Sequence, residues 1–175
     1  LNGQGFLTVT NDGNDLFLQS RSTSLILKSS VIGEVAFSQF DDTLATYWLP
    51  SGLSYDSERD SLIFLYRNMN SNETYLLRLL SKDISPFSTR TVEFTLENLD
   101  TTYNGVYAMT YESPHLYLLA VNNLLEDVLL TIDYNTLSVT NTELIGDSAV
   151  AGIEIVSDSI YLSFRDRSIT FFRGI

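Results

Sequence analysis

Short apolar segments and short polar turns alternate along the whole chain, and one arrangement of them occurs four times. Each time, a glycine opens an apolar segment, a polar turn follows, and a second apolar segment comes after the turn. The opening glycines are Gly5, Gly52, Gly105 and Gly152, so the arrangement recurs about every 50 residues. Two apolar segments joined by a turn rich in Asp, Asn, Ser and Gly predict a β-hairpin.

More strand-like segments follow each hairpin. A third apolar segment occurs in every repeat, at residues 24–28, 74–79, 128–132 and 169–172. A fourth occurs in the first three repeats, at residues 33–37, 89–96 and 138–145. Four antiparallel strands in a repeat of this length are typical of a β-propeller blade. Residues 75–80 and 122–132 also have helical spacing, but the same position is rich in β-formers in the other repeats, which favours strands.

The hydrophobic pattern changes between the second and the fourth strand of a repeat. Residues 62–66 and 115–121 are almost continuously apolar, whereas a sheet with one wet face would alternate. Residues 89–94 and 138–143 do alternate. Because propeller blades pack face to face, we expect the inner strands to be buried on both faces and the outer strands to be wetter.

Two segments carry a resemblance to known propellers. Residues 49–56 and 105–112, each followed by a second apolar strand, resemble the opening strands of blades in the NHL, YVTN and gluconolactonase-like propellers. The resemblance covers most of the chain but is generic, and it implies an architecture without a particular family. The Trp-Asp pair of WD40 repeats and the paired glycines of kelch repeats are absent. We therefore expect an all-β chain, a β-propeller of four-stranded antiparallel blades.

The repeats also predict how the chain is organised. We expect one propeller or partial-propeller domain over residues 1–175, with repeats at about 5–51, 52–104, 105–151 and 152–175. The fourth repeat ends after its third strand, so about four blades are expected, as part of a larger or multi-chain ring. Another chain or a second copy would complete that ring. The first residue is Leu1, which suggests a processed product or an excised piece.

Composition and charge argue against several classes of function. The chain has no cysteine, which excludes disulfides, thiol catalysis and thiolate metal sites. Its formal net charge of −12 repels phosphate backbones and anionic headgroups, so we expect no nucleic-acid partner. No apolar run reaches the length of a membrane span, so we expect no membrane insertion. The acidic surface serves solubility or attracts a basic partner.

Carboxylates recur at the hairpin turns, and two interpretations are open for them. The residues are Asp12, Asp15, Asp56, Asp60, Glu112 and Asp158. They could form a ring of metal ligands, but Asp is also a common turn residue because it accepts backbone N–H bonds. Residues 56–60 begin like a calcium loop yet lack its later glycine and acidic ligand. We therefore predict turn structure and no metal site, and calcium enters only with an alternative function.

The sequence offers little for catalysis. His115 is the single histidine, and no Gly-x-Ser-x-Gly elbow accompanies it. Glu154 is the only acidic residue within a predicted innermost strand. It could belong to a carboxylate site like that of the gluconolactonase-like propellers, pair with a charge in a central channel, or face solvent. We predict no catalytic residue and favour a non-enzymatic function, with an enzymatic one left open.

Aromatic and acidic residues on the connectors between repeats are the candidate binding residues. They are Tyr47, Trp48, Tyr103, Asp41, Asp42 and Asp100. In a propeller, these connectors share a face with the turns between the second and third strands, and such residues suit recognition of a protein, peptide or glycan. Trp48 could instead fill the seam between two blades. Asn72 begins a glycosylation triplet, which agrees with an extracellular or secreted location.

The sequence thus predicts a non-enzymatic binding module that presents a face of loops to a protein, peptide or glycan partner. Two other functions are left open. One is a calcium-dependent propeller hydrolase or lactonase. The other is a structural repeat segment of a larger scaffold or surface protein.

Overall fold

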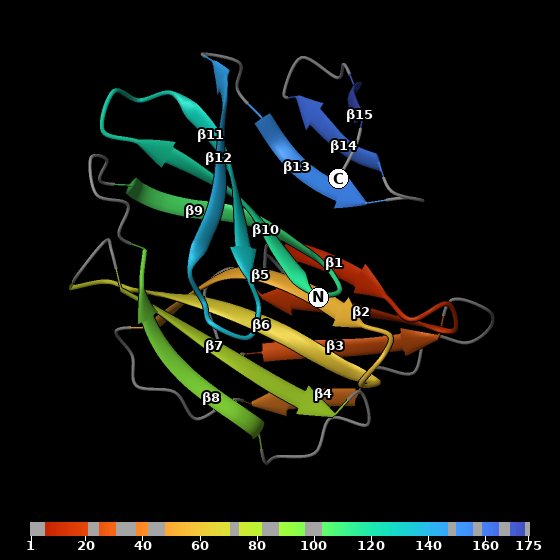
Figure 1. The fold of residues 1–175 in the computed structure, drawn as a ribbon. Helices are drawn as coiled ribbons and strands as arrows, with labels where there is room; N and C mark the ends of the chain where they lie inside the picture. Colours follow the sequence, from red (N-terminus) through yellow and green to blue (C-terminus); the bar gives the residue numbers. More distant parts are fainter. Residues whose placement is uncertain are drawn as a thin grey trace. The chain divides into compact units, whose positions relative to one another are not determined.

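The computed structural model describes the chain in ten segments, and all their regular structure is β-strand (Figure 1). The described residues are 6–20, 25–30, 38–41, 48–70, 74–81, 88–96, 103–146, 150–155, 159–164 and 169–173. Within them, no helix has the length and apolarity needed to cross a membrane. Internal contacts divide the chain into two compact units, Leu1–Phe94 and Thr95–Ile175.

The first unit contains two antiparallel sheets, each formed by strands that are consecutive in the chain. One sheet has the order β1 (Phe6–Asn11), β2 (Asp15–Ser20), β3 (Leu25–Ser30), β4 (Ser38–Asp41). The other has the order β5 (Trp48–Asp56), β6 (Ser61–Asn68), β7 (Thr74–Ser81), β8 (Ser88–Thr95). The last residue of β8 is the first residue of the second unit.

The second unit also contains two sheets. One has the order β9 (Tyr103–Glu112), β10 (His115–Asn122), β11 (Asp127–Asp133), β12 (Val139–Gly146). The other has three described strands, β13 (Val150–Ile155), β14 (Ser159–Phe164) and β15 (Ile169–Arg173).

These sheets confirm the predicted four-stranded antiparallel repeats. Residues 75–80 lie in β7, and residues 122–132 span the end of β10, a turn and most of β11. Their helical spacing therefore does not produce helices. The predicted fourth strand of the first repeat, residues 33–37, lies outside the described residues, and the strand that is described there, β4, begins at Ser38.

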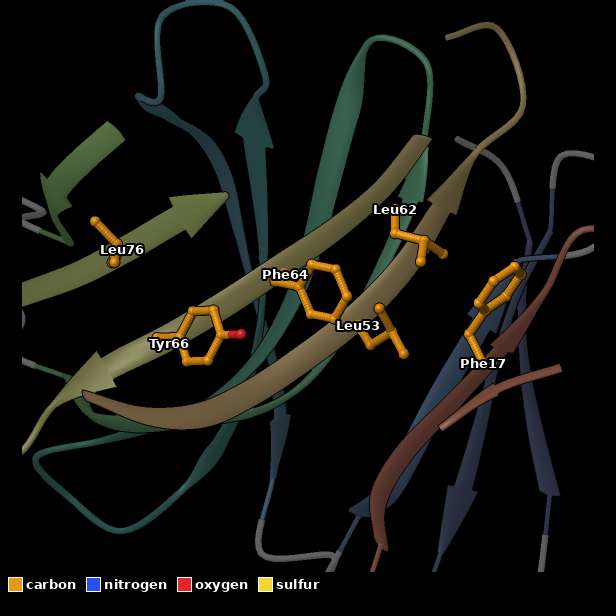
Figure 2. Packing of buried hydrophobic residues seen from close by; sticks show 6 residues of the cluster. All are labelled: Phe17, Leu53, Leu62, Phe64, Tyr66 and Leu76. Atoms are coloured by element: carbon orange, nitrogen blue, oxygen red, sulfur yellow. The ribbon is translucent and has the colours of Figure 1, made fainter. Parts of the chain in front are cut away.

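The core of the first unit lies between its two sheets. Phe17 of β2 packs with Leu53 of β5 and with Leu62, Phe64 and other residues of the second sheet. Figure 2 shows the ring of Phe17 across from the side chains of Leu53 and Leu62. Because hairpins alone bury little apolar surface, this packing between the sheets contributes to the burial that stabilises the unit.

The second unit repeats this arrangement. Tyr117 and Leu119 of β10 pack with Val150, Ile160 and Leu162 of the three-stranded sheet. The apolar strand residues are alternately directed to the two faces of a sheet. In each unit, therefore, one sheet contributes a face to the core of the next sheet along the chain.

Burial falls from the inner strands to the outer strand, as the sequence pattern predicts. Residues 61–66 of β6 and residues 116–120 of β10 are all buried, so both faces of these strands are covered. By contrast, residues 140–144 of β12 are all exposed. The side chains of most of β8 lie outside the described set, so β12 alone tests this expectation for an outer strand.

A single buried carboxylate joins the two sheets of the second unit. Asp127 at the start of β11 is 9% exposed, and its Oδ2 accepts a hydrogen bond from the backbone N–H of Val150 at 3.0 Å. Val150 is the first residue of β13, so the bond fixes the point where the next sheet begins. A buried N–H without an acceptor costs free energy, which gives this contact a role in stability.

Replacing Asp127 should therefore destabilise the second unit. We expect Asp127→Ala to lower the free energy of unfolding by about 1–3 kcal/mol, because the N–H of Val150 loses its acceptor in a buried place. Asp127→Asn is the matched control, since its amide oxygen can still accept, and it should lose less. Urea titration followed by circular dichroism measures both. Equal losses for the two variants would contradict this role of the carboxylate.

Candidate functional site

The strand register brings each connector beside the turn between the second and third strands. Trp48, the first residue of β5, pairs with Asn68 at the end of β6. Tyr103, the first residue of β9, pairs with Asn122 at the end of β10. We call this end of each sheet the turn end. The turn ends are described by residues 48 and 68–70 in the first unit and by residues 103 and 122–126 in the second.

The two described aromatic candidates occupy equivalent positions with different exposure. Trp48 is half-buried and packs against the cluster of Phe17 and its neighbours, which agrees with the alternative of a seam-filling residue. Tyr103 is only 1% exposed. Tyr103 begins a strand and is covered, so the structure does not present it as the surface aromatic that the sequence suggested.

The side chains of the other candidates lie outside the described set. Tyr47, Asp42, Asp100 and the glycosylation candidate Asn72 lie outside the described residues. Asp41 ends β4, and only its backbone is described. The acidic residues Asp41, Asp42 and Asp100 therefore remain predicted binding residues.

The turn end of the second unit is built around Asn122. Its Oδ1 accepts hydrogen bonds from the N–H groups of Leu124 and Glu126, both at 2.9 Å. Its Nδ2 donates to Oε2 of Glu126 at 2.9 Å. Its backbone N–H and C=O bond to Glu126 and Leu125, at 3.0 Å and 3.1 Å. One buried side chain thus organises the whole turn by the side-chain-to-backbone bonds that Asn favours.

This turn displays two leucine side chains. Leu124 is 72% exposed and Leu125 is 77% exposed. Leu125 has φ of 65°, in the left-handed region that Gly and Asn adopt easily and other residues avoid. The turn holds Leu125 in a conformation that costs free energy while its side chain contributes little to the core.

The first unit has a smaller version of the same turn. Oδ1 of Asn68 accepts a hydrogen bond from the N–H of Asn70 at 2.8 Å, and Met69 between them is 56% exposed. Both turns belong to the face predicted from the sequence, but only aromatic and acidic connector residues were candidates there, so these apolar turn residues were missed. The signal that could have found them is the Asn122–Asn123 turn pair directly before two leucines.

Two of the predicted acidic turn residues, Asp12 and Asp56, accept hydrogen bonds within their own turns, whereas Asp158 lies outside the described residues. Oδ1 of Asp12 accepts from the N–H groups of Asn14 and Asp15, at 2.9 Å and 2.7 Å. In the β11–β12 turn, Oδ1 of Asp133 accepts from the N–H of Thr136 at 2.8 Å. The bonds from the backbone and hydroxyl of Thr136 lower the pKa of Asp133, because they stabilise its charged form.

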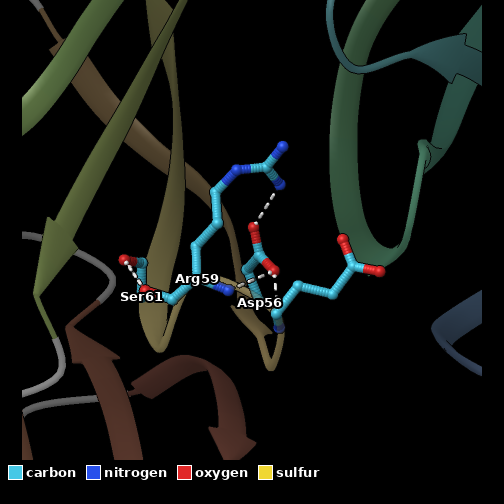
Figure 3. A network of polar contacts seen from close by, with 4 residues as sticks. Asp56, Arg59 and Ser61 are labelled. Atoms are coloured by element: carbon cyan, nitrogen blue, oxygen red, sulfur yellow. Dashed lines mark hydrogen bonds and ion pairs between the residues drawn. The ribbon is translucent and has the colours of Figure 1, made fainter.

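Asp56 is the most buried of these turn carboxylates. It is 0% exposed, and its Oδ1 accepts from the N–H groups of Glu58 and Arg59, at 3.0 Å and 3.2 Å. Its Oδ2 forms an ion pair with Nη1 of Arg59 at 2.8 Å (Figure 3). These partners occupy the carboxylate, and across the described segments no three His, Cys, Asp or Glu residues are grouped so as to hold a metal ion.

His115 and Glu154, the remaining candidates for chemistry, lie in separate sheets. His115 begins β10, and its ring meets the ring of Tyr117 edge-on, with 6.1 Å between centroids. Glu154 lies on β13, opposite Tyr161 of β14. Its side chain is exposed, yet surrounding atoms remove part of the hydration of its carboxyl group, and this raises its pKa.

Comparison with solved structures decides the fold. The chain aligns over 98% of its length with the WD40 β-propeller domain of Doa1, at 12% identity and a TM-score of 0.58. The fold is that of a β-propeller. Each four-stranded sheet is thus a blade, and the generic propeller resemblance seen in the sequence is confirmed.

Other propeller-like neighbours come from different functional contexts. One is a chain of the nidogen/laminin complex, with 11% identity, a TM-score of 0.61, and coverage of 98% of this chain and 65% of that one. Another is the glutaminyl cyclase of Myxococcus xanthus, with 14% identity, a TM-score of 0.67, and coverage of 98% and 72%. No family model and no curated protein matches the sequence.

The propeller neighbours are mostly longer than this chain. The chain spans 52% of the Doa1 domain. Identities of this size establish the blade architecture and leave function to the residues of the site.

The raised pKa of Glu154 predicts a pH-dependent effect on stability. A carboxyl group whose pKa is higher in the folded state than its usual 4.5 binds more protons folded than unfolded between the two values. Stability is therefore lost as pH rises through this window, and the loss remains above it. Glu154→Gln should raise the midpoint of thermal unfolding at pH 7 but leave it unchanged near pH 3. An equal effect at both pH values would contradict the assigned cause.

Proposed function

We propose that this β-propeller chain is a non-catalytic interaction module that binds a protein or peptide through the turn ends of its blades. The connector residues Tyr47, Trp48, Asp41, Asp42 and Asp100 belong to the proposed surface by their place in the repeats. Neighbours in the nidogen/laminin and mitotic checkpoint complexes come from protein assemblies, which supports a binding role for a propeller.

The observation that carries the proposal is the pair of exposed leucines on the turn of Asn122. A leucine in the left-handed region costs about 1 kcal/mol or more, and Asn or Gly would relieve that cost. Because the side chain of Leu125 is exposed, it gains little burial to compensate for this cost. Residues that break a local rule without structural gain are expected at functional sites, and exposed apolar side chains held in fixed positions suit a protein partner.

A protein or peptide partner is favoured over a glycan. Glycan recognition would depend on exposed aromatic side chains at the connectors, and of the two that are described, Tyr103 is covered and Trp48 is half-buried. Leu124, Leu125 and Met69 offer aliphatic surface instead, which matches the side chains of a protein better than the hydroxyl groups of a sugar.

The experiment is a capture comparison in extracts of the cells that make the protein. We expect the double variant Leu124→Ser, Leu125→Asn to lose at least about tenfold in partner recovery, which corresponds to about 1.4 kcal/mol of binding. Its stability should be equal to or higher than that of the parent, because Asn tolerates the left-handed backbone.

Val9→Ser is the matched control, because Val9 is an exposed apolar residue at 54% on β1 and is not one of the turn-end residues. It should leave recovery unchanged. If the double variant recovers the same partners as the parent at equal folded concentration, the proposed surface is wrong.

The alternative of a calcium-dependent hydrolase or lactonase is tested separately. Such a function needs several carboxylates around one ion, and the described turn carboxylates are engaged by their own backbone N–H groups. We expect no change in the melting temperature of the chain between chelator and millimolar calcium. A binding ion would stabilise the folded state in proportion to its occupancy, so a rise of several degrees would overturn the proposal in favour of the enzyme.

A further inference from the structure

The outer strand β12 of the second unit has an open edge. Within the described residues it pairs with β11 on one side, and the sheet order places no strand on its other side (Figure 1). Residues 140–144 are exposed on both faces of the strand. The backbone groups along this edge that point away from β11 are therefore accessible to another strand.

The composition of β12 does not protect this edge. Natural edge strands are commonly guarded by lysine, proline or inward-pointing charges. Val139–Gly146 contains no lysine, arginine or proline, and its one charged residue is Glu143. Register shifts occur near both ends of the pairing with β11, but residues 141–144 between them remain in regular register with residues 128–131. This regular stretch is long enough to begin a ladder of hydrogen bonds.

Exposed leucines lie at the end of the sheet where β12 ends. Leu144 is 58% exposed and pairs with Val128, which follows the start of β11 by one residue. Leu124 and Leu125 lie in the turn that leads into β11. The open edge thus runs toward the apolar turn end, so a chain segment added to β12 could continue onto the two turn leucines.

The charge around the edge indicates which partner would fit. Glu143 is exposed on β12, Glu126 lies in the adjoining turn, and the chain carries a net charge of −12. A second copy would place two acidic edges against each other, which like-charge repulsion disfavours. A segment with basic side chains would be attracted instead.

We propose that β12 accepts an extended, basic segment of a partner protein as an added antiparallel or parallel strand. Backbone hydrogen bonds along residues 141–144 provide affinity, as in other cases of strand addition. Basic side chains of the segment lie near Glu143, and an apolar side chain contacts Leu144. This inference rests on the proposed function, and it names the edge and the chemistry of the partner.

The test uses a short synthetic peptide in which lysine and valine alternate, titrated into the full chain and followed by NMR. We expect amide shifts concentrated at residues 140–144. Two control peptides separate charge from strand pairing. One replaces lysine with glutamate, and the other keeps lysine but carries N-methyl groups on alternate backbone nitrogens, which block one edge of the ladder. Each control should bind at least about tenfold more weakly.

Variants of the chain give the matched test of the surface. Glu143→Lys should weaken binding of the lysine peptide and strengthen binding of the glutamate peptide. Val9→Ser should change neither. Equal binding of the N-methylated peptide would overturn the inference, because charge alone would then explain the affinity. A dimer of the chain that depends on β12 would overturn it in favour of a second copy.

The outcomes distinguish this inference from the proposed function. If the lysine peptide fails to shift residues 140–144, strand addition at β12 is wrong. The capture experiment with the Leu124→Ser, Leu125→Asn variant then still decides whether the turn end binds a partner. If the capture experiment fails while the peptide binds at β12, the site is the strand edge and not the leucine turn.

Discussion

The burial of the inner strands on both faces is the constraint on which the rest of the structure depends. β6 and β10 are apolar on both sides, so neither can be stable in a sheet with one wet face. Packing sheets face to face satisfies them, and Phe17 and Val150 show how each neighbouring sheet contributes to the core. The same arrangement leaves the outer strands with little to bury, which is why β12 is exposed.

The hydrogen bonding of the turns indicates where a binding function can lie. The acidic side chains of Asp12, Asp56 and Asp133 accept hydrogen bonds within their turns, and these bonds stabilise the hairpins. The turn of Asn122 is also stabilised by hydrogen bonds, but it holds two leucine side chains exposed to solvent. The contrast between turns that stabilise the blade and a turn that displays apolar surface is the basis of the proposed binding role.

Much of the fold could be predicted from the sequence. Apolar runs indicate buried strands, turn residues mark their ends, and the repeat of about 50 residues indicates the blades. The site could be predicted less well. Tyr103 lies beside a connector in the sequence, and only the strand register shows that it begins β9 and is covered. Leucine favours strands and helices, so nothing in its type predicts that Leu125 adopts a left-handed turn conformation. That conformation follows from the bonds of Asn122 to residues on both sides.

The inner strands, buried on both faces, carry the stability of the blades, while β12 keeps a free edge. Residue-resolved amide hydrogen exchange by NMR tests it most directly. We expect the slowest exchange in β10. Along residues 140–144, we expect amides protected by β11 to alternate with amides that exchange rapidly. Uniform protection along β12, at a level equal to that of β10, would contradict it.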